Sequence, residues 1–175
     1  VPTANFNLDN LPESSKIWIS NVFADFKFCN KSNISLVESQ KRYKSLINSY
    51  KEPHMLGSDR WLAMIASYEI NPSKGFMVVD IGTAVTFDLV NNSGLHIGGS
   101  IFPGLLKIRK TFEHFPVSKE LNINEFSKTT QNAWSSGTVE LLVNGINQKI
   151  YNTKLRDPDI NILLTGGGFH EVENL

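Results

Sequence analysis

The first of three segments that could carry chemistry is Val79–Thr86, where a carboxylate, a glycine and hydroxyl groups follow one another. Asp80 can hold a cation, and a sharp turn at Gly82 lets successive backbone N–H groups approach and cradle a phosphate. Thr83 adds a hydroxyl at that turn. The alternative is a plain hairpin turn, in which Asp80 and Thr83 only satisfy backbone groups.

The second segment is Gly57-Ser58-Asp59-Arg60, which precedes an apolar, helix-like stretch. A carboxylate beside a guanidinium suits an anionic substrate that carries a hydroxyl group. Asp59 can accept the hydroxyl proton, and Arg60 can bind the negative charge. In the alternative, Asp59 caps the helix and Arg60 forms an ion pair on the surface.

The third segment is an apolar strand pattern that ends in Gly166, Gly167 and Gly168. Such a turn lets a nucleotide approach the backbone, although a flexible turn also explains three glycines. The chain lacks a Gly-x-x-x-x-Gly-Lys-Ser/Thr loop, which excludes that class of nucleotide hydrolase. The histidines share no zinc-ligand spacing, so a surface or structural role is expected for His54, His96, His114 and His170.

The composition favours a globular protein that binds a small molecule or another copy of itself. Hydrophobic residues make up 41% of the 175 residues, and 17 Lys and Arg balance 17 Asp and Glu. This balance, without dense runs of charge, argues against nucleic-acid and membrane partners. Cys29 is the single cysteine, which fits a reducing cytoplasm. Because no signal peptide or bilayer-spanning stretch is recognisable, we predict a soluble, cytoplasmic protein.

Apolar periodicity predicts strands and helices that end at these three segments. A buried helix is expected from Ser58 to Ile70 with Ser58 as its N-cap, and a long helix from Asn132 to Tyr151. A weak apolar spacing predicts a helix over 42–49, and Pro103-Gly104 opens a predicted helix that runs to about Phe115. Strands are expected at 16–22, 34–37, 75–81, 84–90, 95–101 and 160–165, of which 75–81, 84–90 and 95–101 form a meander.

Taken in order, these motifs resemble the type III pantothenate kinases from about Ile17 to the last residue. The resemblance rests on Tyr50, Pro53, Leu56–Trp61, Val79–Thr86, His96–Gly104 and Leu164–Gly168. It implies an α/β chain with the actin-like, ribonuclease-H-like fold of two lobes with mixed sheets. Residues 1–73 would form an incomplete N-terminal lobe with the pantothenate-binding helix start. Residues 74–175 would form the C-terminal lobe, with the second phosphate motif and the adenosine-side glycine turn.

The resemblance also implies ATP-dependent phosphorylation of pantothenate to 4′-phosphopantothenate, the first step of coenzyme A biosynthesis. Asp59 resembles the general base that takes the proton from the pantothenate hydroxyl. Asp80 resembles the ligand of a monovalent cation, potassium or ammonium, and Thr83 resembles an ATP phosphate contact. The implied partners are pantothenate, ATP with Mg²⁺ and a second copy of the chain in a homodimer. The positions that resemble the pantothenate pocket are Tyr50, Gly57, Ser58, Asp59, Arg60 and Thr130.

The resemblance departs from the family pattern at both ends of the chain. The family opens with an Asp-x-Gly-Asn-Thr loop that holds the β- and γ-phosphates, and no such loop precedes Ile17. The family also continues for another strand and helix after the glycine turn. We therefore expect a fragment of a longer protein that shows no kinase activity by itself. The alternative is a non-catalytic regulatory relative, because some relatives were first described as accessory transcription factors.

Overall fold

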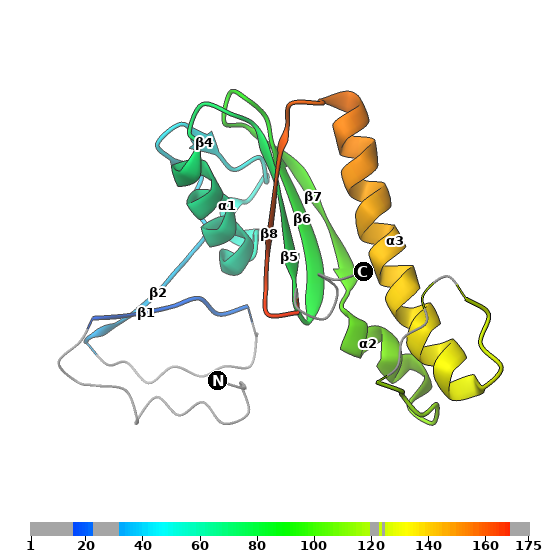
Figure 1. Ribbon diagram of the computed structural model, residues 1–175. Helices are drawn as coiled ribbons and strands as arrows, with labels where there is room; N and C mark the ends of the chain where they lie inside the picture. Colours follow the sequence, from blue (N-terminus) through cyan, green and yellow to red (C-terminus); the bar gives the residue numbers. More distant parts are fainter. Residues whose placement is uncertain (1–15, 23–31, 120–122, 124, 169–175) are drawn as a thin grey trace.

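The computed structural model describes residues 16–22, 32–119, 123 and 125–168. Its centre is a four-stranded mixed sheet in the order β7–β6–β5–β8 (Figure 1). These strands are β5 (Phe76–Ile81), β6 (Ala84–Val90), β7 (His96–Pro103) and β8 (Asn161–Thr165). The first three form the antiparallel meander that the sequence predicts, and β8 runs parallel to β5.

Two long helices cover opposite faces of the sheet (Figure 1). They are α1 (Ser58–Ile70) and α3 (Thr130–Arg156). Successive side chains of a strand point to opposite faces, so β5 contributes to two separate cores. Phe76 and Val78 belong to the core with α1, whereas Met77 and Val79 belong to the core with α3. The central strand is thus fixed in register from both sides, and this fixes the position of the polar residues at its end.

The long helices largely follow the sequence pattern. The predicted bounds of α1 are confirmed, and α3 is longer at both ends than predicted. Thr129 is the N-cap of α3, because its side chain accepts a hydrogen bond from the backbone N–H of Asn132 at 3.2 Å. The predicted helix from Gly104 to Phe115 is a short α2 (Leu105–Arg109) followed by the 3₁₀ turn η4 (Lys110–Phe112).

The prediction of a helix over 42–49 is wrong, because this segment forms a hairpin of β3 (Arg42–Tyr43) and β4 (Leu46–Ile47). Lys44 has a positive φ of 51°, which ends any helical run and makes the turn. Leu46 is fully buried in the core with α1. The backbone N–H of Ile47 donates to the carbonyl of Gly94 at 2.8 Å. Pairing with this distant turn therefore overrides the weak helical spacing.

The prediction of Ser58 as the N-cap of α1 is also wrong, because the helix is capped one residue earlier, at Gly57. The carbonyl of Gly57 accepts the first helical hydrogen bond, from Trp61 at 3.0 Å. The Ser58 hydroxyl instead lies 2.8 Å from the hydroxyl of Ser20. Ser58 thus links the start of α1 to the segment after β1. Its side chain does not cap the free backbone N–H groups of the helix.

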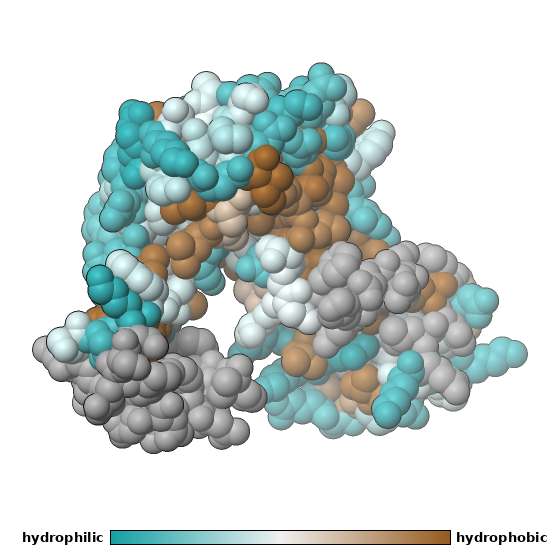
Figure 2. Space-filling model, turned by 60° about the vertical axis from the view of Figure 1, so that its left-hand side comes forward, coloured by the Kyte–Doolittle hydropathy of each residue, from teal (hydrophilic) through white to brown (hydrophobic). Residues whose placement is uncertain are grey.

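The remaining elements flank the start of α1. A parallel pair of short strands and a 3₁₀ turn precede the helix: β1 (Ile17–Ile19), β2 (Ile34–Leu36) and η3 (Pro53–Met55). Figure 2 shows apolar side chains gathered in the middle of one face of the molecule. Among the exposed apolar residues, Ile70 and Leu164 are exposed by 73% and 47%. No helix in the described part of the chain has the length and apolar character needed to cross a bilayer. The division into lobes at residues 73 and 74 stays a prediction.

Candidate active site

The glycine turns predicted to approach phosphate meet at one end of the sheet. β5 and β8 are parallel, so their carboxyl ends lie side by side, with Asp80 opposite Thr165. The backbone N–H of Gly168 donates to the carbonyl of Ile81 at 2.8 Å, which ties the two turns together. Gly166 has a φ of +104°, and a Cβ there would collide with the Asp80 carboxylate and the Ile81 carbonyl. Only glycine therefore fits at position 166, where the two turns come into contact.

A cavity of about 600 Å³ opens beside these turns. Gly82, Thr83, Gly167 and Gly168 line it from the sheet. Lys107 and Lys110 line it from α2 and η4, and neither belongs to the three segments predicted to carry chemistry. The sequence offered one indication of this role, which is their spacing of three residues in the helical segment after Gly104. This spacing places both ammonium groups on the same side of the helix. Bare backbone and two cations suit the phosphates of a nucleotide.

Asp80 carries an electrostatic sign of a functional site. Partial burial raises the pKa of its carboxyl above the ordinary range, and the negative charge of Asp59 raises it further. The predicted base and the predicted cation ligand therefore lie within electrostatic range of each other. Two neighbouring carboxylates form a local negative field that a bound cation would relieve, so the residues present fit a cation.

Replacing Asp80 with asparagine should raise the free energy of unfolding at neutral pH. A carboxyl whose pKa is raised by folding stabilises the protein below its unfolded pKa, and this contribution is lost as the pH rises through the folded pKa. At pH 7 the ionised Asp80 is thus unfavourable, and an amide removes the cost. Thermal unfolding in buffer without alkali-metal salts should show a higher stability of the variant at pH 7 and little difference from the wild type at pH 4. A loss of stability at pH 7 would contradict this prediction. The control is Asp159→Asn, at an exposed position.

Asp59 lies at the first turn of α1 with its side chain exposed. Its Oδ1 accepts a hydrogen bond from the backbone N–H of Arg60 at 2.7 Å, which holds the carboxylate back over the helix start. A Cβ on Gly57 would lie only 2.6 Å from the same oxygen. Glycine at position 57 therefore leaves the space that this carboxylate occupies, and the other carboxylate oxygen is left for a ligand.

Arg60 is the centre of a buried polar network. Its Nε and Nη2 donate to the two carboxylate oxygens of Asp88 at 2.8 and 2.6 Å, and its Nη1 donates to the Tyr50 hydroxyl at 3.1 Å. His96 Nε2 donates to Asp88 at 3.0 Å, and the ring of His96 stacks on that of Tyr50. Arg60, Asp88 and His96 are exposed by 7%, 2% and 0%. The interpretation of Arg60 as part of a surface ion pair is therefore wrong.

The network fixes the charge of both partners. Burial tends to raise the pKa of the Asp88 carboxyl, but hydrogen bonds from His96 and Arg60 outweigh burial and lower it. Burial likewise tends to lower the pKa of Arg60, but Asp88 and Tyr50 raise it overall. A Cβ on Gly99 would collide with the Arg60 guanidinium, so a glycine on β7 makes room for the ion pair. Sequence reasoning missed Asp88, whose signal was only a single acidic residue in an apolar strand.

Three predicted substrate positions, Gly57, Ser58 and Thr130, lie outside this network. Gly57 and Ser58 line a cavity of about 760 Å³ beside the start of α1. Its lining includes Ser39, whose buried hydroxyl has no hydrogen-bond partner among the described residues. Thr130 is exposed at the start of α3, on the face of the sheet opposite α1. One chain therefore brings Tyr50, Asp59 and Arg60 to α1 but leaves Thr130 on the other side.

The chain is similar to known proteins over most of its length. A sequence model described as type III pantothenate kinase matches residues 4–152. The type III pantothenate kinase of Pseudoalteromonas translucida is 36% identical over 149 residues, or 78% of this chain and 60% of the relative. That of Cellvibrio japonicus is 32% identical over 146 residues, or 78% of this chain and 57% of the relative.

Among solved structures, one from Campylobacter jejuni, described as a conserved Baf family transcriptional activator, superposes with a TM-score of 0.60. It is 27% identical, and the match covers 91% of this chain and 72% of that one. The chain spans about 60% of the length of the curated relatives that it matches. The family match nevertheless extends over most of its residues. The chain belongs to the type III pantothenate kinase family.

Proposed function

We propose that the protein containing this chain transfers the γ-phosphoryl group of ATP to the hydroxyl of pantothenate, the first step of coenzyme A biosynthesis. One observation supports the proposal: Asp59, Asp80 and the cavity beside Gly82 and Thr83 lie at one end of the sheet. Asp59 and Asp80 interact electrostatically there, and the cavity beside Gly82 and Thr83 offers bare backbone with two lysines. Membership of the kinase family supports the same assignment.

The residues then take complementary roles. The Asp59 carboxylate accepts the proton of the hydroxyl as its oxygen bonds to phosphorus, and the bond to the β-phosphate oxygen breaks, releasing ADP. Gly82, Thr83, Lys107 and Lys110 hold the phosphates, with Mg²⁺ as the ion that travels with the nucleotide.

On the acceptor side, Arg60 has three of its five N–H donors engaged among the described residues. It therefore acts partly by fixing the Tyr50 hydroxyl towards the substrate. Gly57, Ser58 and Ser39 line the adjoining cavity, which offers polar groups for pantothenate.

The proposal is tested by measuring ADP release and phosphopantothenate formation by the product of the full reading frame that encodes this chain. We expect turnover that requires both ATP and pantothenate. Omitting pantothenate separates kinase activity from simple ATP hydrolysis. Absence of phosphopantothenate from a folded protein that contains a complete pair of lobes would overturn the assignment.

Asp80 is proposed to hold a monovalent cation, which would supply positive charge near the transferred phosphate. We expect activity to depend on potassium or ammonium, with sodium substituting poorly, because a larger ion with a weaker hydration shell loses its water more readily. The dependence should weaken in Asp80→Ala. Rates measured with potassium, ammonium, sodium or tetramethylammonium chloride at constant ionic strength test this. Equal rates in all four salts would contradict a cation site and leave Asp80 with a structural role in the turn.

We also propose a homodimer in which Thr130 of one protomer completes the pantothenate site of its partner. The position of Thr130 on the face opposite α1 supports this, because a single chain leaves that residue away from Tyr50 and Arg60. A balanced net charge favours self-association over binding to nucleic acid or membranes. A cytoplasmic location fits such an enzyme. Light scattering gives the oligomeric state, and mixing Thr130→Ala with Asp59→Asn protomers should restore one intact composite site per mixed dimer.

A regulatory protein is the second candidate, favoured by the description of the Campylobacter jejuni structure. In that case the polar network would bind a ligand without turnover. Calorimetric titration with pantothenate and ATP distinguishes the two, since a regulator would bind and release them unchanged. The raised pKa of Asp80, next to the proposed base Asp59, favours the kinase, because perturbed carboxyl pKa values are common at catalytic sites.

A further inference from the structure

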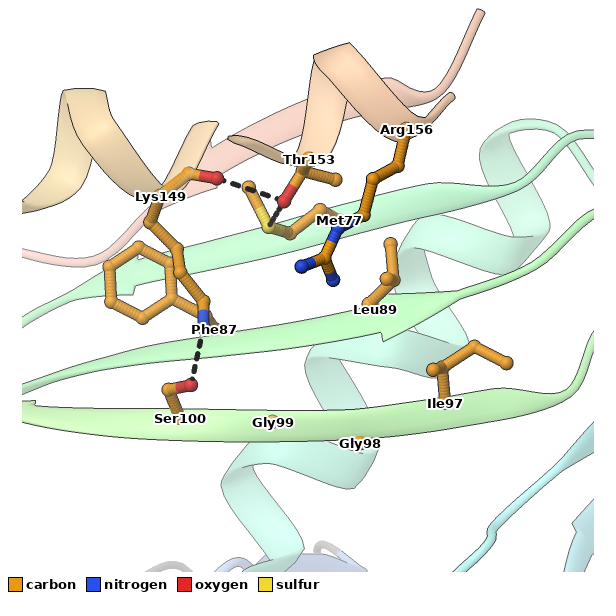
Figure 3. A pocket seen from close by; sticks show the side chains of 10 residues that line it. All are labelled: Met77, Phe87, Leu89, Ile97, Gly98, Gly99, Ser100, Lys149, Thr153 and Arg156. Atoms are coloured by element: carbon orange, nitrogen blue, oxygen red, sulfur yellow. Dashed lines mark hydrogen bonds between the residues drawn. The ribbon is translucent and has the colours of Figure 1, made fainter. Parts of the chain in front are cut away.

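A third cavity, of about 270 Å³, lies between β7 and the C-terminal half of α3 (Figure 3). It shares no lining residue with the cavity beside Gly82 and Thr83. Its floor is apolar, with Met77 and Phe87 almost completely buried beneath it. None of the roles proposed above uses this cavity.

Two cations of α3 stand at the rim of the cavity. Lys149 and Arg156 are seven residues apart, which places them on the same side of the helix two turns apart. Lys149 Nζ donates to the Ser100 hydroxyl at 2.8 Å, which holds the ammonium group over the cavity. Figure 3 shows the guanidinium of Arg156 turned into the cavity, towards Leu89. The lining contains no acidic residue, so its charge is positive.

The opposite wall is an edge strand with exposed backbone. β7 is the outer strand of the described sheet, so part of its N–H and C=O groups have no partner strand. A β-bulge between Leu89 and Val90 of β6 shifts the register opposite Ile97. Gly98 there has a φ of +137°, and a Cβ on it would meet nothing within 4 Å. The backbone is therefore bare where it faces the two cations.

We propose that this cavity binds a small organic anion that consists of a carboxylate or phosphate head on a short apolar chain. The head lies between Lys149 and Arg156, within reach of the Ser100 hydroxyl and the bare backbone at Gly98. The chain covers Leu89 and the exposed Ile97, which lie above the buried Met77 and Phe87. Two cations alone would bind any anion, and an apolar surface alone would bind any apolar molecule. Their combination in one open cavity favours amphipathic anions.

The test is a titration of the isotope-labelled protein, following the backbone amide signals of Gly98, Gly99 and Ser100 by NMR. Hexanoate and hexyl phosphate are the two anionic probes, and hexanol is the uncharged control. We expect saturable shifts with at least one anion, and the tighter of the two identifies the head group. Added salt should weaken binding, since Arg156 is exposed to solvent.

The variants Lys149→Gln and Arg156→Gln should each weaken binding of the tighter probe about tenfold, because each loses one charge-assisted hydrogen bond. The matched control is Lys154→Gln, which removes a cation from the same helix that bonds to the Pro158 carbonyl outside the cavity. It should bind as the wild type does. Unchanged affinity in both test variants, equal binding of hexanol, or no saturable shift with either anion would each overturn the proposal.

Discussion

Replacing Asp59 with asparagine should lower kcat for pantothenate phosphorylation by about 10²–10⁴-fold, the usual contribution of a general base. Asparagine has nearly the same shape, and its carbonyl oxygen can still accept the hydrogen bond that the Arg60 N–H donates to Asp59 at 2.7 Å. The helix start therefore remains intact, but the side chain can no longer take up a proton. Rates of phosphopantothenate formation at saturating ATP measure the effect.

The matched control for this experiment lies on the same helix. Glu69→Gln also removes one negative charge from α1, but Glu69 is exposed and pairs with Lys44 at 2.7 Å, away from the proposed site. Its kcat should stay close to that of the wild type. Circular dichroism confirms that both variants are folded. If the Asp59 variant turned over as fast as the wild type, Asp59 would be no more than a residue that holds the helix start.

Replacing Asp88 with asparagine should lower the free energy of unfolding by about 3–5 kcal/mol, because it leaves the buried Arg60 without its counter-charge. Arg60 and Asp88 are exposed by 7% and 2%, and two hydrogen bonds join them. Asp88 Oδ1 accepts from both Arg60 Nη2 and His96, so an amide that keeps its oxygen there turns its own N–H towards the Arg60 Nε–H, and that hydrogen bond is lost. Urea unfolding at neutral pH measures the difference.

The pH dependence of this difference tests its electrostatic origin. Folding lowers the pKa of Asp88, so its carboxylate stabilises the protein above the unfolded pKa and loses that effect as the pH falls through the folded pKa. The gap between wild type and Asp88→Asn should therefore be full at pH 7 and shrink below about pH 4. Glu69→Gln breaks an exposed pair and should change stability little. An Asp88 variant as stable as this control would contradict the prediction.

The sequence by itself predicts most of the sheet and the long helices, because those elements are encoded locally. Alternating apolar residues and the turn after Val90 define the meander, and the apolar body of 58–70 defines α1. The motifs around Asp59, Asp80 and Gly166 also predict the family, which the comparisons confirm. The roles of Asp59, Tyr50 and Thr83 stay predictions.

The tertiary structure alone decided what depends on contacts between distant segments. The spacing of Tyr43, Leu46 and Ile47 suits a helix, but pairing with Gly94 and burial against α1 make it a hairpin. Nothing near Arg60 in the chain indicates that its charge is matched by a carboxylate 28 residues away on β6. A charged side chain is placed by the partner that compensates its desolvation, and that partner is chosen by the fold. For the same reason the sequence does not predict a ligand-binding role for Lys107, Lys110 or the cations of α3. That role depends on the fold, which places glycine backbone in the same cavity linings.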